Sequence, residues 1–185
     1  MKQTLLLQIC CATCGGYISS ELIKEFSLTL YFCNPNLFPA KEWEKRLADV
    51  KALAAELQVA LIIDKQDYEN WKQTKAGLEN EPEKGKRCVI CYNERLAKTA
   101  QLARQKDFAH FGTTLTTSPY KDGETILSIG RKLQTELGLL GQAGVKFLDR
   151  DFKKDNGWQK AIAWSKEHNY YRQKFCGCEF SLIKN

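Results

Sequence analysis

Several common features are scarce or missing in this 185-residue sequence. No apolar run approaches the ~20 residues that a membrane-spanning helix requires. The first residues have neither the long apolar core nor the small-residue cleavage site of a signal peptide. No Gly-x-Gly-x-x-Gly, Walker A or Ser-Gly-Gly-type pyrophosphatase loop is present, which argues against nucleotide binding in the usual way. We therefore expect a cytoplasmic protein with no membrane partner.

Histidine is also scarce, and this leaves cysteine as the main candidate for metal ligation. His110 falls in a predicted strand and His168 ends a predicted helix, so structural roles are expected for both. Eight cysteines are present, and a cytosolic chain keeps its thiols reduced. They occur as Cys10-Cys11-x-x-Cys14, a lone Cys33, Cys88-x-x-Cys91 and Cys176-x-Cys178. Close groups from separated parts of a chain are typical of metal sites, so zinc and iron–sulfur are the alternatives.

The number of thiols favours two metal centres. Leaving Cys33 aside as a small buried hydrophobe, seven thiols divide into four for a [4Fe–4S] cluster and three for a mononuclear ion with an open position. A disulfide oxidoreductase that uses Cys11-Ala-Thr-Cys14 remains an alternative. It would leave the other two groups of thiols unexplained.

The hydrophobic pattern alternates between strands and helices, without repeats, low-complexity tracts or linkers. We predict one α/β domain over residues 1–185, with a Rossmann-like, largely parallel sheet of about five strands flanked by helices. The predicted strands are 5–9, 28–33, 59–63, 108–115 and 145–148. The predicted helices are 17–26, 41–57, 67–78, 88–106, 125–137 and 157–168, with a loop at 138–144. Gly15-Gly16 is interpreted as the turn into the first helix.

Two segments are expected to meet at the carboxyl ends of the strands, where open α/β sheets place their sites. The first is the thiol-rich end of the first strand, where alternation on extended backbone predicts that Cys10 and Cys11 point to opposite sides. The second is the hydroxyl-rich segment 112–119, for which the sequence alone favours an ordinary polar loop with a helix cap over a site role. Cys88 and Cys91 are predicted one turn apart at a helix start, where backbone N–H groups favour thiolates.

The formal net charge of +6 is unevenly distributed. Seven basic residues lie between Lys84 and Lys106 against Glu94 alone, and eight lie in 150–185 against four acidic ones. Both regions contain cysteines. A basic surface around a site predicts an anionic partner, nucleic acid before others, and a solvated lysine-rich surface is the alternative.

Five segments together resemble the epoxyqueuosine reductase QueH family. They are Cys10-Cys11-Ala-Thr-Cys14, Tyr31-Phe-Cys-Asn-Pro-Asn36, Glu81-Pro-Glu-Lys-Gly-Lys-Arg-Cys-Val-Ile-Cys-Tyr92, Thr113-Thr-Leu-x-x-Ser-Pro119 and Tyr171-Arg-Gln-Lys-Phe-Cys-Gly-Cys-Glu-Phe-Ser181. They span nearly the whole chain in the right order. Thr13 stands where the family commonly has proline, Gln8 where it often has histidine and Cys33 where it often has tyrosine. None of these departures removes a clustered thiol.

The resemblance implies an oxidoreductase that reduces the epoxide of epoxyqueuosine at the wobble position of tRNA, giving queuosine without cobalamin. It implies a [4Fe–4S] cluster and a separate iron, with tRNA and an external electron donor as partners. An open-site iron would polarise the epoxide oxygen while the cluster supplies electrons. A zinc-stapled tRNA-binding module without redox chemistry is the alternative.

Candidate residues follow from these interpretations. The predicted metal ligands are Cys10, Cys11, Cys14, Cys88, Cys91, Cys176 and Cys178, of which Cys11, Cys88, Cys91 and one tail thiol are assigned to the cluster. Cys10 and Cys14 would hold the single ion and are predicted to be catalytic, together with Asp151 as a proton donor or metal-site carboxylate. A surface cap is an equally good role for Asp151. The candidate substrate-binding residues are Arg87, Thr113, Thr114, Ser118, Tyr171, Arg172 and Gln173.

Overall fold

The computed structural model describes residues 1–138 and 144–182, and it contains a five-stranded, wholly parallel sheet. The strands are β1 (Thr4–Gln8), β2 (Ser27–Phe32), β3 (Ala60–Ile63), β4 (His110–Thr113) and β5 (Lys146–Phe147). Their order across the sheet is β3-β2-β1-β4-β5, with β1 in the centre. This is the order of a doubly wound Rossmann-type sheet, so the predicted fold class is confirmed.

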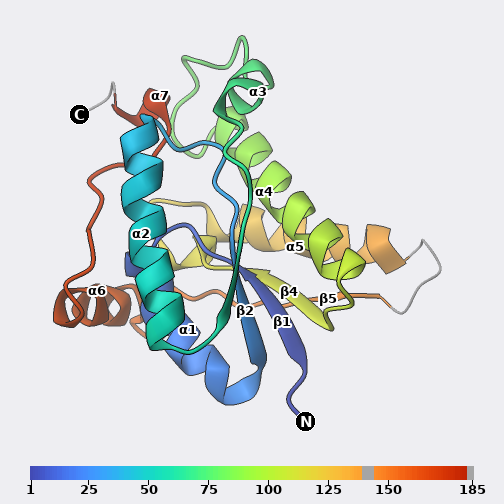
Figure 1. Cartoon of the computed structure of the whole chain (residues 1–185). Coiled ribbons are helices and arrows are strands. Elements are labelled where there is room, and N and C mark those ends of the chain that lie inside the picture. The colour runs from blue at the N-terminus through green and yellow to red at the C-terminus, as the bar shows by residue number, and fades with distance from the viewer. Residues whose placement is uncertain (139–143, 183–185) are drawn as a thin grey trace.

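Helices cover both faces of the sheet (Figure 1). One face carries α4 (Lys86–Gln105) and α5 (Gly123–Gly138), and the other carries α1 (Ala12–Glu25), α2 (Ala40–Glu56) and α6 (Gly157–Glu167). The short helices α3 (Tyr68–Gln73) and α7 (Glu179–Leu182) and the 3-10 turn η1 (Leu115–Thr117) complete the described elements. Within the described residues, no helix is both long enough and apolar enough to span a membrane.

The central strand divides the core between the two faces. Leu5, Leu7 and Ile9 pack with the α1 and α2 side, whereas Leu6 packs with the α4 and α5 side. All four side chains are fully buried, as expected for a strand covered on both faces. The carboxyl end of β1 is thereby fixed in the middle of the molecule.

The start of the first helix was predicted wrongly. Helix α1 begins at Ala12 rather than at Tyr17, with Cys11 as its N-cap, and Gly15 and Gly16 lie inside the helix. A Cβ at Gly15 would overlap Ile9, and one at Gly16 would overlap the ring of Trp164 in α6. The glycines therefore permit close packing of the helix, and they do not form a turn.

Other boundaries differ by smaller amounts. The predicted helix over 67–78 is the shorter α3, and β4 ends at Thr113 because Leu115–Thr117 form η1. Helix α4 begins at Lys86, two residues earlier than predicted. The predicted loop over 138–144 falls largely outside the described residues.

Candidate metal centre

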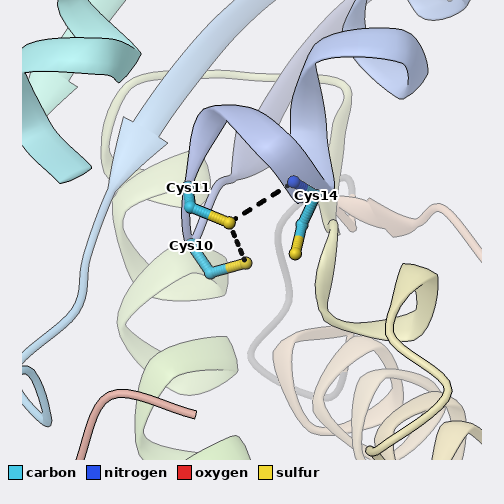
Figure 2. Close-up of side chains that lie close together, drawn as sticks. All are labelled: Cys10, Cys11 and Cys14. Atoms are coloured by element: carbon cyan, nitrogen blue, oxygen red, sulfur yellow. Dashed lines mark hydrogen bonds between the residues drawn. The ribbon is translucent and has the colours of Figure 1, made fainter. Parts of the chain in front are cut away.

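Three thiols converge at the carboxyl end of β1 (Figure 2). The Sγ atoms of Cys10, Cys11 and Cys14 all lie within 4.8 Å of one another, and those of Cys10 and Cys11 are 3.7 Å apart. The prediction that Cys10 and Cys11 point to opposite sides is therefore wrong. Alternation holds only on extended strand backbone, and here β1 has already ended at Gln8.

The start of α1 holds this triad in place. Cys11 has extended backbone as the N-cap, and its Sγ accepts a hydrogen bond from the Cys14 backbone N–H at 3.3 Å. This leaves Cys14 in the first turn, with its side chain beside the two preceding thiols (Figure 2). The Thr114 hydroxyl lies 3.8 Å from Cys10 Sγ and accepts from the Cys10 backbone N–H.

Gln8 connects the ends of three neighbouring strands beneath the triad. Its amide nitrogen donates to the Cys33 carbonyl and to Asn34 Oδ1, and its carbonyl oxygen accepts from the Thr113 hydroxyl at 2.7 Å. The side chain is completely buried. Thr113, a predicted substrate-binding residue, is thus engaged in holding the strand ends together.

The three thiols share protons unequally. Hydrogen bonds from the Cys11 and Cys14 thiols lower the pKa of Cys10 well below its ordinary value. Burial raises the pKa of Cys11 to about 12, and the hydrogen bonds with Cys10 and Cys11 raise the pKa of Cys14. Cys10 is therefore the easiest of the three to ionise, and a bound cation would favour ionisation of all three.

The other four clustered cysteines form a looser group near the start of α4. Cys88, Cys176 and Cys178 line one small cavity, and Cys91 packs with Cys178 against Trp71 and Phe180. Burial raises the pKa of Cys88 and Cys178, and it raises that of Cys91 to about 11. All eight cysteines are free thiols.

Arg46 of α2 fixes the segment that carries the tail thiols. Its guanidinium donates to the backbone carbonyls of Phe175 and Cys176, and it pairs with Glu42 inside the protein. Gly177 has φ +116, and its carbonyl accepts from the Phe38 N–H. The sharp turn at glycine therefore lets Cys176 line one cavity with Cys10 and Cys14 while Cys178 packs with Cys91.

A cavity of about 500 Å³ connects the two groups of thiols. Cys10, Cys14 and Cys176 line it, together with Arg95, Lys121, Lys174, Trp158 and Ser118 among others. Burial disfavours the Lys121 ammonium, but the negative charge of Cys176, Cys10 and Cys14 outweighs this and raises the pKa of Lys121. The cavity thus combines soft ligands, cations and aromatic surface.

Of the three substrate-binding residues predicted in the tail, only Gln173 lies beside the thiols. Gln173 lies at the triad, where its amide nitrogen is 3.0 Å from Cys11 Sγ and 3.6 Å from Cys14 Sγ. The Tyr171 hydroxyl donates to Glu42 and its backbone N–H to Asp49, while Arg172 is exposed. Neither Tyr171 nor Arg172 lines the cavity between the thiols.

Two other predicted site residues lie away from this cavity. Asp151 lines a separate cavity beside α1, and its carboxylate accepts from the Lys153 N–H, as a turn-capping residue does. Arg87 is 1% exposed and bound to backbone carbonyls, a position that does not support contact with tRNA. Ser118 lines the cavity as predicted.

Sequence reasoning missed four residues of the site, namely Arg46, Trp71, Arg95 and Lys121. Arg95 donates to the Cys33 carbonyl and to Asn34 Oδ1, one turn along α4 from Cys91. Arg95 could have been predicted, because it follows Cys91 by four residues on a predicted helix and therefore lies on the same helix face. No sequence pattern indicated Arg46, Trp71 or Lys121, because tertiary packing alone brings them to the thiols.

The donor set fits an iron–sulfur centre. Seven free thiols lie in two adjoining groups, and the buried nitrogen donors of Trp71 and Arg87 belong to residues beside the second group, where hydrogen bonds to sulfur would tune a cluster. The 3.7 Å between Cys10 and Cys11 is close to the edge of a thiolate tetrahedron with ~2.3 Å metal–sulfur bonds, which fits two thiolates on a single metal ion.

Comparison with known proteins identifies close sequence relatives. A sequence model of the family described as "Epoxyqueuosine reductase QueH" matches residues 5–184. A relative of that name from Streptococcus pyogenes serotype M1 is 34% identical over 188 residues, covering 98% of this chain and 71% of its own. One from Thermotoga maritima is 31% identical over 184 residues, covering 98% and 91%.

A solved structure shares the fold. The U34-tRNA thiolase NcsA from Methanococcus maripaludis, with its [4Fe-4S] cluster, matches with a TM-score of 0.54 at 10% identity. The match covers 98% of this chain and 62% of that one. At this identity the similarity supports the α/β fold alone.

Proposed function

Because the chain belongs to the epoxyqueuosine reductase QueH family, we propose that it reduces the epoxide of epoxyqueuosine at the wobble position of tRNA to give queuosine. The protein is an oxidoreductase of that family. The observation that carries the proposal is the thiol triad opening onto a cavity of about 500 Å³, with four cationic side chains on its wall. A splayed-out anticodon base fits such a site.

The thiols are proposed to hold a [4Fe–4S] cluster and a separate iron ion. The thiolase with a similar fold carries a [4Fe-4S] cluster, so a fold of this kind can accommodate one. Cys88 and Cys91, which do not line the larger cavity, are proposed as cluster ligands, and Cys14, which does, as a ligand of the ion. Since the sulfurs of Cys10 and Cys11 converge beside Cys14, all three are proposed as ligands of the ion, and Cys11 is no longer assigned to the cluster.

Both tail thiols are proposed to complete the cluster, which differs from the division predicted from the sequence. Cys178 is buried with Cys91 against Trp71, which favours the cluster side. Cys176 lines the small cavity with Cys88 and Cys178 and would be the fourth ligand, so the three triad thiols remain for the ion. When bound, these groups would supply electrons singly and polarise the epoxide oxygen.

The protein's own side chains are proposed to bind and orient the substrate. Trp158 and Phe175 offer aromatic surface for stacking a base, and Lys121 and Lys174 offer positive charge beside it. Reduction consumes two electrons and two protons, breaks both C–O bonds of the epoxide and releases water and an alkene. The proposed partners are tRNA carrying epoxyqueuosine and an external electron donor, in the cytoplasm.

Metal analysis and a turnover assay test this function together. Protein purified anaerobically should contain about five irons per chain, four for the cluster and one for the ion, and show a broad absorption band. With a chemical reductant it should convert epoxyqueuosine in tRNA to queuosine, as measured by mass spectrometry of digested nucleosides. Stoichiometric zinc, no iron uptake after reconstitution and no conversion would support the zinc-stapled binding module instead.

A further inference from the structure

Arg87 is a buried cation whose hydrogen-bonding capacity is only partly used. It has 1% of its surface exposed, which makes it the largest fully buried side chain among the described residues. One terminal nitrogen, Nη1, donates to the carbonyls of Leu78, Glu79 and Glu81 at 2.8–3.0 Å. Its Nε and Nη2 are buried and have no acceptor within the described part of the chain.

Buried donors without acceptors are rare in folded proteins because each is deprived of water without compensation. Three other cations are buried among the described residues. Arg46 pairs with Glu42 and Lys75 with Glu94, and the Nε and Nη2 of Arg95 donate to the Cys33 carbonyl and Asn34 Oδ1. The hydrogen-bonding partners of Arg87 are neutral carbonyls, and its guanidinium lies 4.8 Å from the centre of the Phe180 ring. An anionic acceptor close to Nε and Nη2 would account for both its charge and its donors.

Thiols are the acceptors at hand. Arg87 lines the small cavity together with Cys88, Cys176 and Cys178. Its positive charge also opposes the rise in pKa that burial causes at Cys88 and Cys178. Arg87 therefore lines the same cavity as three of the thiols assigned to the cluster.

We propose that Arg87 is a positioning residue of the metal centre, whose Nε–H and Nη2–H donate to the sulfurs of a cluster held by the neighbouring thiolates. This inference rests on the proposed function and goes beyond it, because it replaces the predicted role of Arg87 in tRNA binding. The buried charge also offsets the negative charge of the thiolate-bound cluster. Since a reduced cluster is more negative, Arg87 stabilises that state and raises the reduction potential.

Redox titration of reconstituted protein tests the role. Arg87→Met, which removes charge and donors, should shift the cluster midpoint to a more negative potential. Arg87→Lys, which keeps the charge but loses the planar fork, should give a smaller shift in the same direction. Lys86→Met is the matched control, because it removes an exposed charge from the adjacent residue and should leave the potential unchanged.

A stability measurement separates this role from anchoring of the 78–81 loop. If Arg87 only anchors that loop, Arg87→Lys will lower the melting temperature equally in metal-free and cluster-loaded protein. The proposal predicts a larger loss in the loaded form. Equal losses in melting temperature for the two forms, together with unchanged reduction potentials in the iron-loaded variants, would overturn the proposal. If wild-type protein binds no cluster, the proposed function fails instead.

Discussion

At Cys10 and Cys11, the end of a strand determines which thiols can share a metal ion. Period-two alternation predicted opposite directions, but β1 ends at Gln8 and Cys11 caps α1, so both sulfurs point to one place. The sequence was enough to predict which cysteines are candidate metal ligands. It was not enough to predict the directions of their side chains, because the strand ends and the helix begins within two residues of them.

Serine variants at single thiols should separate the two centres. We expect Cys14→Ser to abolish epoxide reduction while most of the cluster absorbance survives, because Cys14 lines the larger cavity and Cys88 does not. Cys88→Ser should bleach the cluster. Cys10→Ser and Cys11→Ser should resemble each other in iron content and spectrum, since the two sulfurs lie 3.7 Å apart.

Cys33 provides the matched control for these variants. It is fully buried, and its thiol donates to Asp64 at 3.3 Å. We expect Cys33→Ala to keep both metal and activity at a cost of about 1 kcal/mol in the free energy of unfolding. If Cys14→Ser bleaches the protein as completely as Cys88→Ser does, the proposed division of ligands is wrong.

At the scale of single elements, α1 is the clearest case of packing that a sequence pattern conceals. The pair Gly15-Gly16 was interpreted as a turn because glycine commonly ends regular structure. Inside α1 the same residues let the helix approach Ile9 and the ring of Trp164 in α6. Propensity cannot distinguish these roles, since the approaching ring comes from a helix more than 140 residues later.

Replacing Gly16 should therefore damage the contact between α1 and α6. Gly16→Ala introduces a methyl group that overlaps the Trp164 ring, and overpacking of this kind costs roughly 1–3 kcal/mol in unfolding free energy. Chemical denaturation followed by tryptophan fluorescence would measure it. Ser20→Ala, on the same helix at a half-buried position, is the control and should change stability by less than about 0.5 kcal/mol. Equal stability of Gly16→Ala and wild type would show that Trp164 moves aside freely.

At the scale of the whole molecule, the alternation of strands and helices was enough to predict a doubly wound parallel sheet. The position of Cys10, Cys11 and Cys14 at its carboxyl edge, beside the segment 112–119, followed from that topology. The sequence did not predict the buried hydrogen bonds between the thiol segments. Examples are those from Arg46 to the Phe175 and Cys176 carbonyls and those that Gln8 makes with the ends of the neighbouring strands. These contacts join residues distant in sequence and have no local pattern.

Exposed lysines beside the thiols are the candidate contacts for tRNA phosphates. Lys84 and Lys86 are exposed next to the α4 thiols, and exposed Lys174 lines the larger cavity. If these three contact phosphates, their combined change to Ala should weaken tRNA binding and reduce the slope of log affinity against log salt by roughly two to three. The iron content and absorption spectrum should stay the same.

Three lysines at the opposite edge of the sheet make the matched control. Lys24, Lys51 and Lys106 are exposed near the ends of α1, α2 and α4, helices that run from the carboxyl edge toward the amino edge. Their combined change to Ala removes the same net charge, so any general effect of charge will appear in both triple variants. The tRNA affinity of each triple variant, measured at a series of salt concentrations, would give the two slopes for direct comparison. Equal slopes for the two variants would show that the basic surface beside the thiols is only solvated and that the tRNA approaches from elsewhere.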